Sequence, residues 1–379
     1  MTIGLDARMA PRCMNGIWRY VSSLLAELTA LPGEVRYAVF GTGRTWELLG
    51  EMGRAPPVDR LDCGGLGEHT YLRALWGRVR MPRQIRCSGI QVMHFPALIA
   101  TCRTSVPYVL TLHDLSHFVR WGWHRTLRDA YMRRLIPPSA RAARFVIVPC
   151  RRVADEAVRI LGLSRDRVVV IPEGVDQRFR PEDQEAARQS AAAVVGCADP
   201  YLLYVGWVEP RKDVATLIEA YRLVRQRLGP AAPPLIIAGP RGWKAAAVYR
   251  RARDSDLAPH VTMTGPVPEA ALPSLYAGAL AFVYSSVYEG FGLPVLEAMA
   301  CGTPVVAVRG ACGDFVDDEV AALVPPSAPG GLAEAIVALV RDEALRWQLR
   351  AAGLARAARY TWRTAAERTR AVYLEACRG

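Results

Sequence analysis

Short apolar runs that end in glycine, proline or polar residues recur through the first half of the chain. After the first run, apolar positions from about 17 to 28 are spaced as on one face of a helix. Strands that alternate with helices in this way predict a doubly wound parallel sheet. The predicted strands of this half are residues 1–8, 36–40, 91–94, 107–112, 145–148 and 168–171.

The second half repeats this rhythm after residues 172–176, which we interpret as a linker. We expect an α/β protein with two doubly wound, Rossmann-like domains, residues 1–173 and 174–360, that face a central cleft. We expect the last helix, about 361–379, to pack back on the first domain. The predicted strands here are 200–205, 234–238, 261–264, 280–284, 305–308 and 322–324, and helices are predicted at 214–228, 294–300 and from 332 onward.

One stretch, YSSVYEGFGLPVLEAMACGTPVVAV, holds two glutamates, Glu289 and Glu297, on either side of a predicted helix start. Pro294 suits the first turn of a helix, and Gly302 is a suitable end. Backbone N–H groups at residues 290–293 would then lie at the positive end of the helix, which predicts an anion site. A plain glycine turn, with Glu297 as a solvated helix residue, is the alternative.

A second candidate site lies at the end of the predicted strand 200–205. The chain has 46 arginines and only two lysines, and one of these, Lys212, follows Arg211 close to Gly206. A guanidinium and an ammonium together at a strand end could bind a diphosphate, the arginine bidentately and the lysine as a point charge. A solvated pair at a helix start is the alternative.

Composition narrows the class of protein. Of 379 residues, 51% are hydrophobic and 22% charged, as in a soluble globular protein. The sequence contains no run of 18 apolar residues, so no membrane-spanning helix is expected. The first residues do not resemble a signal peptide. Nine scattered cysteines without a C-x-x-C pair favour a reduced, cytoplasmic protein over a disulfide scaffold or a zinc site.

The positive charge lies entirely in the first half. Residues 1–170 hold 25 arginines against 13 acidic residues, a net +12, whereas residues 171–379 hold 23 of each sign. Two basic stretches with aromatic residues, 71–86 and 118–134, could lie on an anionic bilayer, with Arg73, Arg78 and Arg80 as contacts in the first. A normal surface helix that packs its apolar face on the sheet is an equal alternative for 71–86, and contact with an acceptor is the alternative for 118–134. An anionic substrate, nucleic acid or a merely solvated arginine-rich surface are the alternatives.

Histidines follow the predicted strand 107–112. His113 is placed to line a cleft at the strand end. His113 and His117 could share a metal ion as an i,i+4 pair, but no third ligand of suitable spacing is evident, so no metal site is predicted.

Several of these segments together resemble glycosyltransferase family 4. The specific matches are GWVEPRKDVATLIEAY and YEGFGLPVLEAMACGTPVVA, and weaker ones are IGLDARM, NGIWRYVSSLL, VLTLHDLSHF and VVVIPEGVD. The resemblance implies a GT-B fold and a retaining transferase that uses a nucleotide-sugar donor and requires no divalent metal or other cofactor. The first half is most similar to bacterial polysaccharide and O-antigen mannosyltransferases, which implies GDP-mannose first and a UDP-sugar next.

The resemblance also implies roles for individual residues. Arg211 and Lys212 would bind the donor diphosphate and stabilise the leaving group, while Glu289 would approach the hydroxyls of the donor sugar. Glu297 would hold the ribose hydroxyls. The backbone of Gly290, Phe291, Gly292 and Leu293 would contact the sugar and the phosphate.

In the first half, the resemblance implies that Gly16 lets a loop approach the donor phosphate and that His113 faces the transferred sugar. Gly206 would keep the strand end clear for the nucleotide. The chain departs from the family pattern in three places. Glu173 stands where the family usually has asparagine, and Pro149-Cys150 stand where a serine commonly follows the strand. Trp18 replaces a glycine, where it could crowd the phosphate or form an aromatic wall for the acceptor.

We therefore expect a cytoplasmic hexosyltransferase, peripheral on the inner face of the membrane, that glycosylates a hydroxyl of a glycan or lipid-linked acceptor in surface polysaccharide synthesis. One alternative is a UDP-sugar transferase with a small-molecule acceptor, and another is an epimerase or phosphorylase of similar fold. A sugar- or nucleic-acid-binding module is the non-enzymatic alternative. Because no aromatic-basic nucleic-acid motif accompanies the charge, nucleic acid is not an expected partner.

Overall fold

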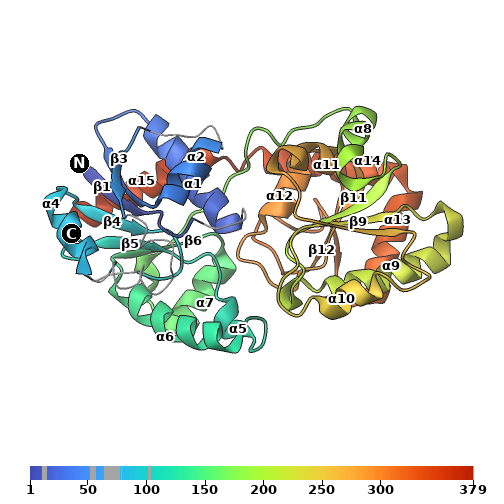
Figure 1. Cartoon of the computed structure of the whole chain (residues 1–379), viewed down its shortest axis with the longest axis horizontal. Helices are drawn as coiled ribbons and strands as arrows, with labels where there is room; N and C mark the ends of the chain where they lie inside the picture. Colours follow the sequence, from blue (N-terminus) through green and yellow to red (C-terminus); the bar gives the residue numbers. More distant parts are fainter. Residues whose placement is uncertain (11–14, 52–56, 64–76, 78, 101–103, 379) are drawn as a thin grey trace. The chain divides into compact units, whose positions relative to one another are not determined.

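The protein consists of two compact units, each built around one parallel sheet flanked by helices (Figure 1). The computed structural model describes residues 1–378 apart from 11–14, 52–56, 64–76, 78 and 101–103. The first unit comprises Met1–Trp121, Thr126–Gly174 and Thr361–Gly379, and the second comprises Gly122–Arg125 and Val175–Tyr360. Both units are α/β with a parallel sheet, which confirms the fold class predicted from the alternation of strands and helices.

The first unit contains a seven-stranded sheet of order β3-β2-β1-β4-β5-β6-β7. Its order reverses between β1 and β4, so that the loops after these two strands diverge at this point. The strands are β1 (Thr2–Asp6), β2 (Arg36–Gly41), β3 (Asp59–Asp62), β4 (Val92–Phe95), β5 (Tyr108–Thr111), β6 (Phe145–Val148) and β7 (Val168–Val170). The helices are α1 (Gly16–Ala30), α2 (Gly43–Glu51), α4 (Met81–Cys87), α5 (Ser116–Val119), α6 (Thr126–Ala142), α7 (Arg151–Leu161) and α15 (Trp362–Arg378).

The second unit contains a six-stranded sheet of order β10-β9-β8-β11-β12-β13, which reverses between β8 and β11. The strands are β8 (Tyr201–Val205), β9 (Leu235–Ala238), β10 (Val261–Gly265), β11 (Ala279–Tyr284), β12 (Val305–Val308) and β13 (Ala322–Val324). The helices are α8 (Gln184–Val195), α9 (Val214–Leu228), α10 (Ala246–Arg251), α11 (Leu272–Gly278), α12 (Leu293–Ala300), α13 (Pro329–Arg341) and α14 (Glu343–Ala357). All recorded strand pairs in both sheets are parallel.

Local sequence explains the elements that bear on the site. The Asn15 side chain accepts a hydrogen bond from the Trp18 N–H at 2.9 Å and so caps α1. The buried face of α1 includes Val21, Leu24 and Leu28, which confirms the predicted helix. In contrast, β3 was not predicted, because its sequence DRLD is polar and largely exposed at the sheet edge.

The prediction of a basic amphipathic helix over 71–86 is tested only in part, because residues 71–76 and 78, with Arg73 and Arg78, lie outside the described residues. Within the described part, α4 begins with Pro82 in its first turn and buries Met81 and Ile85. Among the described residues, none of the helices is long and apolar enough to span a bilayer. Seven cysteines of the described part are free thiols.

The chain crosses between the units at residues 121–122, 125–126, 174–175 and 360–361, and the last two crossings run close together. Within the first unit, a Cβ on Gly174 would lie 2.2 Å from the Trp362 backbone nitrogen, so only glycine fits there. Within the second unit, the Val175 N–H donates to the Tyr360 carbonyl at 3.0 Å. Gly174 and Val175 are therefore packed against residues 360–362.

A buried polar chain holds α15 in the first unit. The Tyr373 hydroxyl lies 2.7 Å from His94 Nδ1, and His94 Nε2 lies 2.8 Å from the Thr111 hydroxyl. Burial, with a smaller contribution from His113, lowers the pKa of His94 to about 3, so this ring is neutral. The Tyr20 hydroxyl of α1 also contacts Thr111, at 3.1 Å.

Candidate functional site

Two loops of the second unit meet where the strand order reverses. One follows β8 and contains a single 3-10 turn, Pro210–Lys212, and the other follows β11 and leads into α12. The Val287 N–H donates to the Arg211 carbonyl at 3.0 Å, and the Ser285 hydroxyl donates to the Lys212 carbonyl at 2.8 Å. The backbone thus joins the two loops at the usual ligand position of a doubly wound sheet.

Glu289, from the second loop, pairs with both cations of the first. Arg211 Nη1 lies 2.9 Å from Glu289 Oε2, and Lys212 Nζ lies 2.5 Å from Glu289 Oε1. The three side chains are 12%, 10% and 9% exposed, so the alternative of a solvated Arg211–Lys212 pair is wrong.

Further polar groups complete this ion cluster. Lys212 Nζ donates to the Tyr284 hydroxyl at 2.8 Å, and that hydroxyl donates to Glu289 Oε1 at 3.0 Å. The Ser286 hydroxyl also donates to Glu289 Oε1. Arg211 Nη2 lies 3.2 Å from Glu209 Oε1, a second carboxylate that sequence analysis did not single out.

Glu289 is ionised in this environment. Burial by itself would raise its pKa, but Arg211, Lys212 and the Ser286 hydroxyl together outweigh burial and lower the pKa of Glu289 to about 2. Burial also keeps Tyr284 neutral, with a pKa well above its ordinary value. The cluster therefore contains two cations held by a carboxylate that does not exchange protons near neutral pH.

Glycines shape the ends of both strands. Gly206 has φ +154°, and a Cβ there would lie 3.0 Å from the Tyr204 hydroxyl. A Cβ on Gly239, after the neighbouring β9, would lie 2.1 Å from the Gly206 carbonyl oxygen. The two strand ends consequently approach each other in a way that side chains would prevent. The requirement for glycine at position 239 was missed in the sequence.

The predicted helix after Glu289 is confirmed. Gly292 caps α12 with φ +102°, and a Cβ there would lie 3.0 Å from Cys312 Sγ. Pro294 lies in the first turn, and Gly302, with φ +75°, follows the end. Leu293 is the first helical residue, and Gly290 precedes it in the buried loop.

Phe291 and Glu297 are both buried. The Phe291 ring packs on Phe315 at a centroid distance of 4.8 Å, so its side chain belongs to the core and only its backbone faces the loop. Glu297 is 1% exposed and its Oε2 accepts a hydrogen bond from the Tyr276 hydroxyl at 3.0 Å. The alternative of Glu297 as a solvated helix residue is wrong.

In the first unit, Gly16 opens α1 after β1. A Cβ on Gly16 would meet no atom within 4 Å, so packing among the described residues does not require glycine there. Trp18 is buried at 2% exposure and therefore does not present an exposed aromatic wall.

His113 follows β5 and lies between two acceptors. Its Nδ1 is 2.9 Å from Glu173 Oε1, and its Nε2 is 2.8 Å from the Pro96 carbonyl. The Tyr20 ring contacts the imidazole edge to face at 4.7 Å. Glu173, a departure from the family pattern, was not identified as a site residue from sequence.

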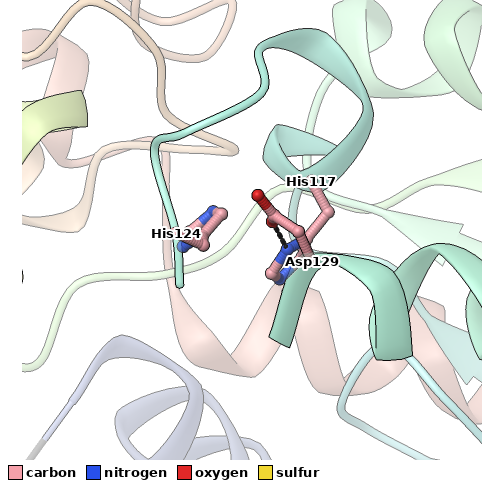
Figure 2. Close-up of side chains that lie close together, drawn as sticks. All are labelled: His117, His124 and Asp129. Atoms are coloured by element: carbon pink, nitrogen blue, oxygen red, sulfur yellow. Dashed lines mark hydrogen bonds and ion pairs between the residues drawn. The ribbon is translucent and has the colours of Figure 1, made fainter. Parts of the chain in front are cut away.

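His117 has a different partner, so the structure does not support an ion shared by His113 and His117. His117 Nδ1 lies 2.6 Å from Asp129 Oδ1, and both side chains are buried (Figure 2). Figure 2 also shows His124, and ligand-type atoms of these three residues lie within 4.8 Å of one another. Asp129 and His124 were not considered as ligands from the sequence.

Both halves of the chain match families of sugar-transferring enzymes. Residues 14–179 match Glycosyltransferase Family 4, and residues 199–342 match Glycosyl transferases group 1. O-antigen chain mannosyltransferase B from Escherichia coli is 30% identical over 265 residues, which are 69% of this chain and 68% of that protein. D-inositol 3-phosphate glycosyltransferase from Nocardia farcinica is 34% identical over 56% of this chain and 49% of that protein.

Solved structures show the same fold. The Anabaena protein Alr3699/HepE in complex with UDP-glucose has a TM-score of 0.76 at 18% identity, covering 98% of this chain and 99% of that one. WaaG, a glycosyltransferase involved in lipopolysaccharide biosynthesis, has a TM-score of 0.73 at 14% identity, covering 98% and 99%. The fold of the chain is GT-B.

The ion cluster predicts a stability effect. Glu289→Gln removes the charge that Arg211 and Lys212 share, and breaking a buried ion pair on one side costs about 3 kcal/mol. We expect the free energy of unfolding, measured with urea at pH 7, to fall by about that amount. Glu334→Gln, whose exposed pair with Arg227 spans 3.5 Å, is the control and should change it by less than about 0.5 kcal/mol.

The difference in the free energy of unfolding between wild type and Glu289→Gln should depend on pH. Because the folded pKa of Glu289 is below its value in the unfolded chain, about 4.3, the stabilisation is complete above that pH and is lost as pH falls toward 2. Wild type and Glu289→Gln should therefore converge in acid. Equal stability at pH 7 would contradict the assignment of Glu289 as the counter-charge.

Proposed function

Because the chain belongs to glycosyltransferase family 4, we propose that it transfers a hexose, in the first instance mannose, from a nucleoside diphosphate sugar to a hydroxyl of a glycan or lipid-linked acceptor in bacterial surface polysaccharide synthesis. The observation that carries the proposal is the pair of buried cations, Arg211 and Lys212, at the reversal point of the second sheet. Similarity to an O-antigen mannosyltransferase supports GDP-mannose as the donor.

A UDP-sugar is the second candidate donor. The relatives include a D-inositol 3-phosphate glycosyltransferase, and the similar Anabaena protein forms a complex with UDP-glucose. This alternative would pair a UDP-sugar with a small-molecule acceptor on the same cation site. The two candidates differ in nucleotide and acceptor and share the chemistry at the diphosphate.

We propose that the two cations stabilise the leaving group electrostatically. Departure of the nucleoside diphosphate places negative charge on phosphate oxygens, and fixed cations away from water stabilise this charge strongly. Arg211 would bind two oxygens bidentately and Lys212 a third as a point charge. These two cations supply the charge that a divalent metal would otherwise provide, so we propose turnover without added metal.

Glu289 acts as a counter-ion and binding group in this proposal. When the diphosphate binds Arg211 and Lys212, it takes over the charge neutralisation that Glu289 now provides. The carboxylate can then accept hydrogen bonds from hydroxyls of the donor sugar. A pKa of about 2 makes Glu289 a weak base at neutral pH, which disfavours a role in deprotonating the acceptor.

The proposed reaction proceeds with retention by attack on the face that the leaving group occupies. The bond between the anomeric carbon and the phosphate oxygen breaks, and a bond to the acceptor oxygen forms on the same face. The acceptor proton passes to the departing phosphate oxygen. The backbone of residues 290–293, at the positive end of α12, and Gly16 of the first unit would contact sugar and phosphate, while Gly206 would leave space for the nucleotide.

Two further side chains complete the proposed donor site. Glu297, buried on α12, would hold the ribose hydroxyls, and its bond from Tyr276 fixes the carboxylate plane for that contact. His113, at the end of β5, would face the transferred sugar. Both roles rest on the family resemblance together with the burial of Glu297 within α12 and the position of His113 after β5.

An anionic bilayer is the proposed partner of the first unit. Four exposed apolar side chains, Val119, Trp121, Leu127 and Tyr131, lie within 13 residues around α5 and the start of α6. The guanidinium of Arg133 stacks over Trp121 at 4.8 Å. Residues 118–134 contain five arginines and one acidic residue, so aromatic anchors and positive charge coincide as on a peripheral membrane surface.

Turnover tests the proposed donor site. Lys212→Ala and Arg211→Ala should each reduce nucleoside diphosphate release from GDP-mannose by about a hundredfold or more, because each removes a cation that stabilises the leaving group. Lys244→Ala, which removes the other lysine of the chain at an exposed position, is the control and should keep near-normal turnover.

The assay should compare GDP-mannose with UDP-glucose, each with and without a lipid-linked acceptor and in the presence of EDTA. Preference for UDP-glucose would select the second candidate donor. Normal turnover of the Lys212→Ala variant would rule out the proposed diphosphate site.

Vesicle sedimentation tests the membrane partner. The protein should sediment with phosphatidylglycerol vesicles more than with phosphatidylcholine vesicles, and less at high salt, because salt screens the arginines. The double variant Trp121→Ala/Leu127→Ala should sediment less, whereas Trp347→Ala, at an exposed position of α14, should not change binding. Sedimentation that does not depend on lipid charge, on salt or on the Trp121→Ala/Leu127→Ala substitution would contradict the proposed membrane partner.

A further inference from the structure

We propose that Glu173 is a positioning residue that holds the His113 ring as an imidazolium, so that His113 acts in the donor site as a fixed positive charge and never as a base. The effect on turnover rests on the proposed function. The protonation state of the ring does not, because it follows from contacts within the first unit.

The geometry around the ring carries the proposal. His113 Nδ1 lies 2.9 Å from a carboxylate oxygen of Glu173, and Nε2 lies 2.8 Å from the Pro96 carbonyl oxygen. The Pro96 oxygen and an ionised Glu173 can only accept hydrogen bonds. A neutral imidazole carries one N–H and would leave one of these contacts without a proton, whereas the imidazolium donates to both.

Glu173 is held in place by the passage between the units. The next residue, Gly174, fits against the Trp362 backbone only because it has no Cβ. The Tyr20 ring packs on His113 at 4.7 Å and on Trp362 at 5.9 Å, which closes the other side of the imidazole. Glu173 and His113 are 6% and 12% exposed, so water competes little for this pair.

The charged and titratable groups around the ring agree with this state. Burial alone would lower the pKa of His113, but hydrogen bonding and charge from Glu173, with smaller contributions from Pro96 and Asp114, raise it above its ordinary value. His94 on β4 is neutral, and burial raises the pKa of Tyr20 on α1, so neither adds a charge near neutral pH. Glu173 is therefore the main source of the stabilised cation.

The consequence for the reaction is specific. An imidazolium has no lone pair on nitrogen and cannot take a proton from an acceptor hydroxyl. It can donate a hydrogen bond to a sugar hydroxyl by exchanging the Pro96 carbonyl for it.

Nitrogen NMR tests the protonation state directly. In protein with ¹⁵N-labelled histidine, six rings contribute, and His113→Gln assigns the ring in question. Both His113 nitrogens should show the shifts of protonated nitrogens at pH 7.5. In Glu173→Gln the midpoint of titration should fall by about one pH unit or more, which lowers the protonated fraction above the midpoint about tenfold.

Three variants separate positioning from stability. Glu173→Asp should restore part of the shift. Asp129→Asn alters the other buried histidine–carboxylate pair, at His117, and should leave His113 unchanged. A His113 ring with one unprotonated nitrogen at pH 7.5 in the wild type, or an unchanged titration in a folded Glu173→Gln protein, would overturn the proposal.

Kinetics give the second readout. At pH 6 the kcat/KM of Glu173→Gln for the donor should be close to that of wild type. At pH 8 it should be about tenfold lower than that of wild type, because the His113 ring of the variant is deprotonated at that pH. An equal loss at every pH would indicate a structural role and would contradict the proposal. If no donor is turned over at all, the proposed function fails, and the NMR result still decides the state of His113.

Discussion

The proposed site of the second unit depends on two buried cations and on the carboxylate between them. Burying Arg211 and Lys212 without a counter-charge would be strongly unfavourable, and Glu289 supplies that charge through contacts of 2.9 and 2.5 Å. The same arrangement orients the cations and shields them from water. Two cations that need an anionic partner can bind a diphosphate. Glu289 provides the negative charge when no diphosphate is bound.

The surrounding backbone makes that cluster possible. The cations and the glutamate come from loops after β8 and β11, the adjacent strands at which the sheet order reverses. Glycines at 206, 239 and 292 permit close approaches that a Cβ would block. In the first unit, a corresponding strand end carries His113, and the passage at Gly174 fixes its partner Glu173. In each unit, a carboxylate thus pairs with a cationic group that follows a strand: Glu289 with Arg211 and Lys212, and Glu173 with His113.

Much of this follows from local sequence. The helix after Glu289 could be predicted because proline and glycine mark its two ends, and the α/β alternation gave most strands within a residue or two. The importance of Lys212 could be inferred because the chain has only two lysines. These features depend on residues that are close to one another in the sequence.

The pairings could not be predicted, because they depend on which strands are adjacent. Glu289 meets Lys212 across 77 positions and His113 meets Glu173 across 60, and no local pattern records such contacts. The burial of Glu297 was equally hidden, since its partner Tyr276 lies on α11. The edge strand β3 was missed because its residues are polar and need little burial.

Binding of the donor diphosphate by the cations paired with Glu289 can be measured directly, because the chain has only two lysines. In protein with ¹⁵N-labelled lysine side chains, only two ammonium groups contribute, those of Lys212 and Lys244. Titration with GDP should shift the Lys212 signal and leave Lys244 in place, while guanosine, which lacks the diphosphate, should shift neither. A Lys212 signal that does not respond to GDP or UDP at saturating concentration would contradict the account.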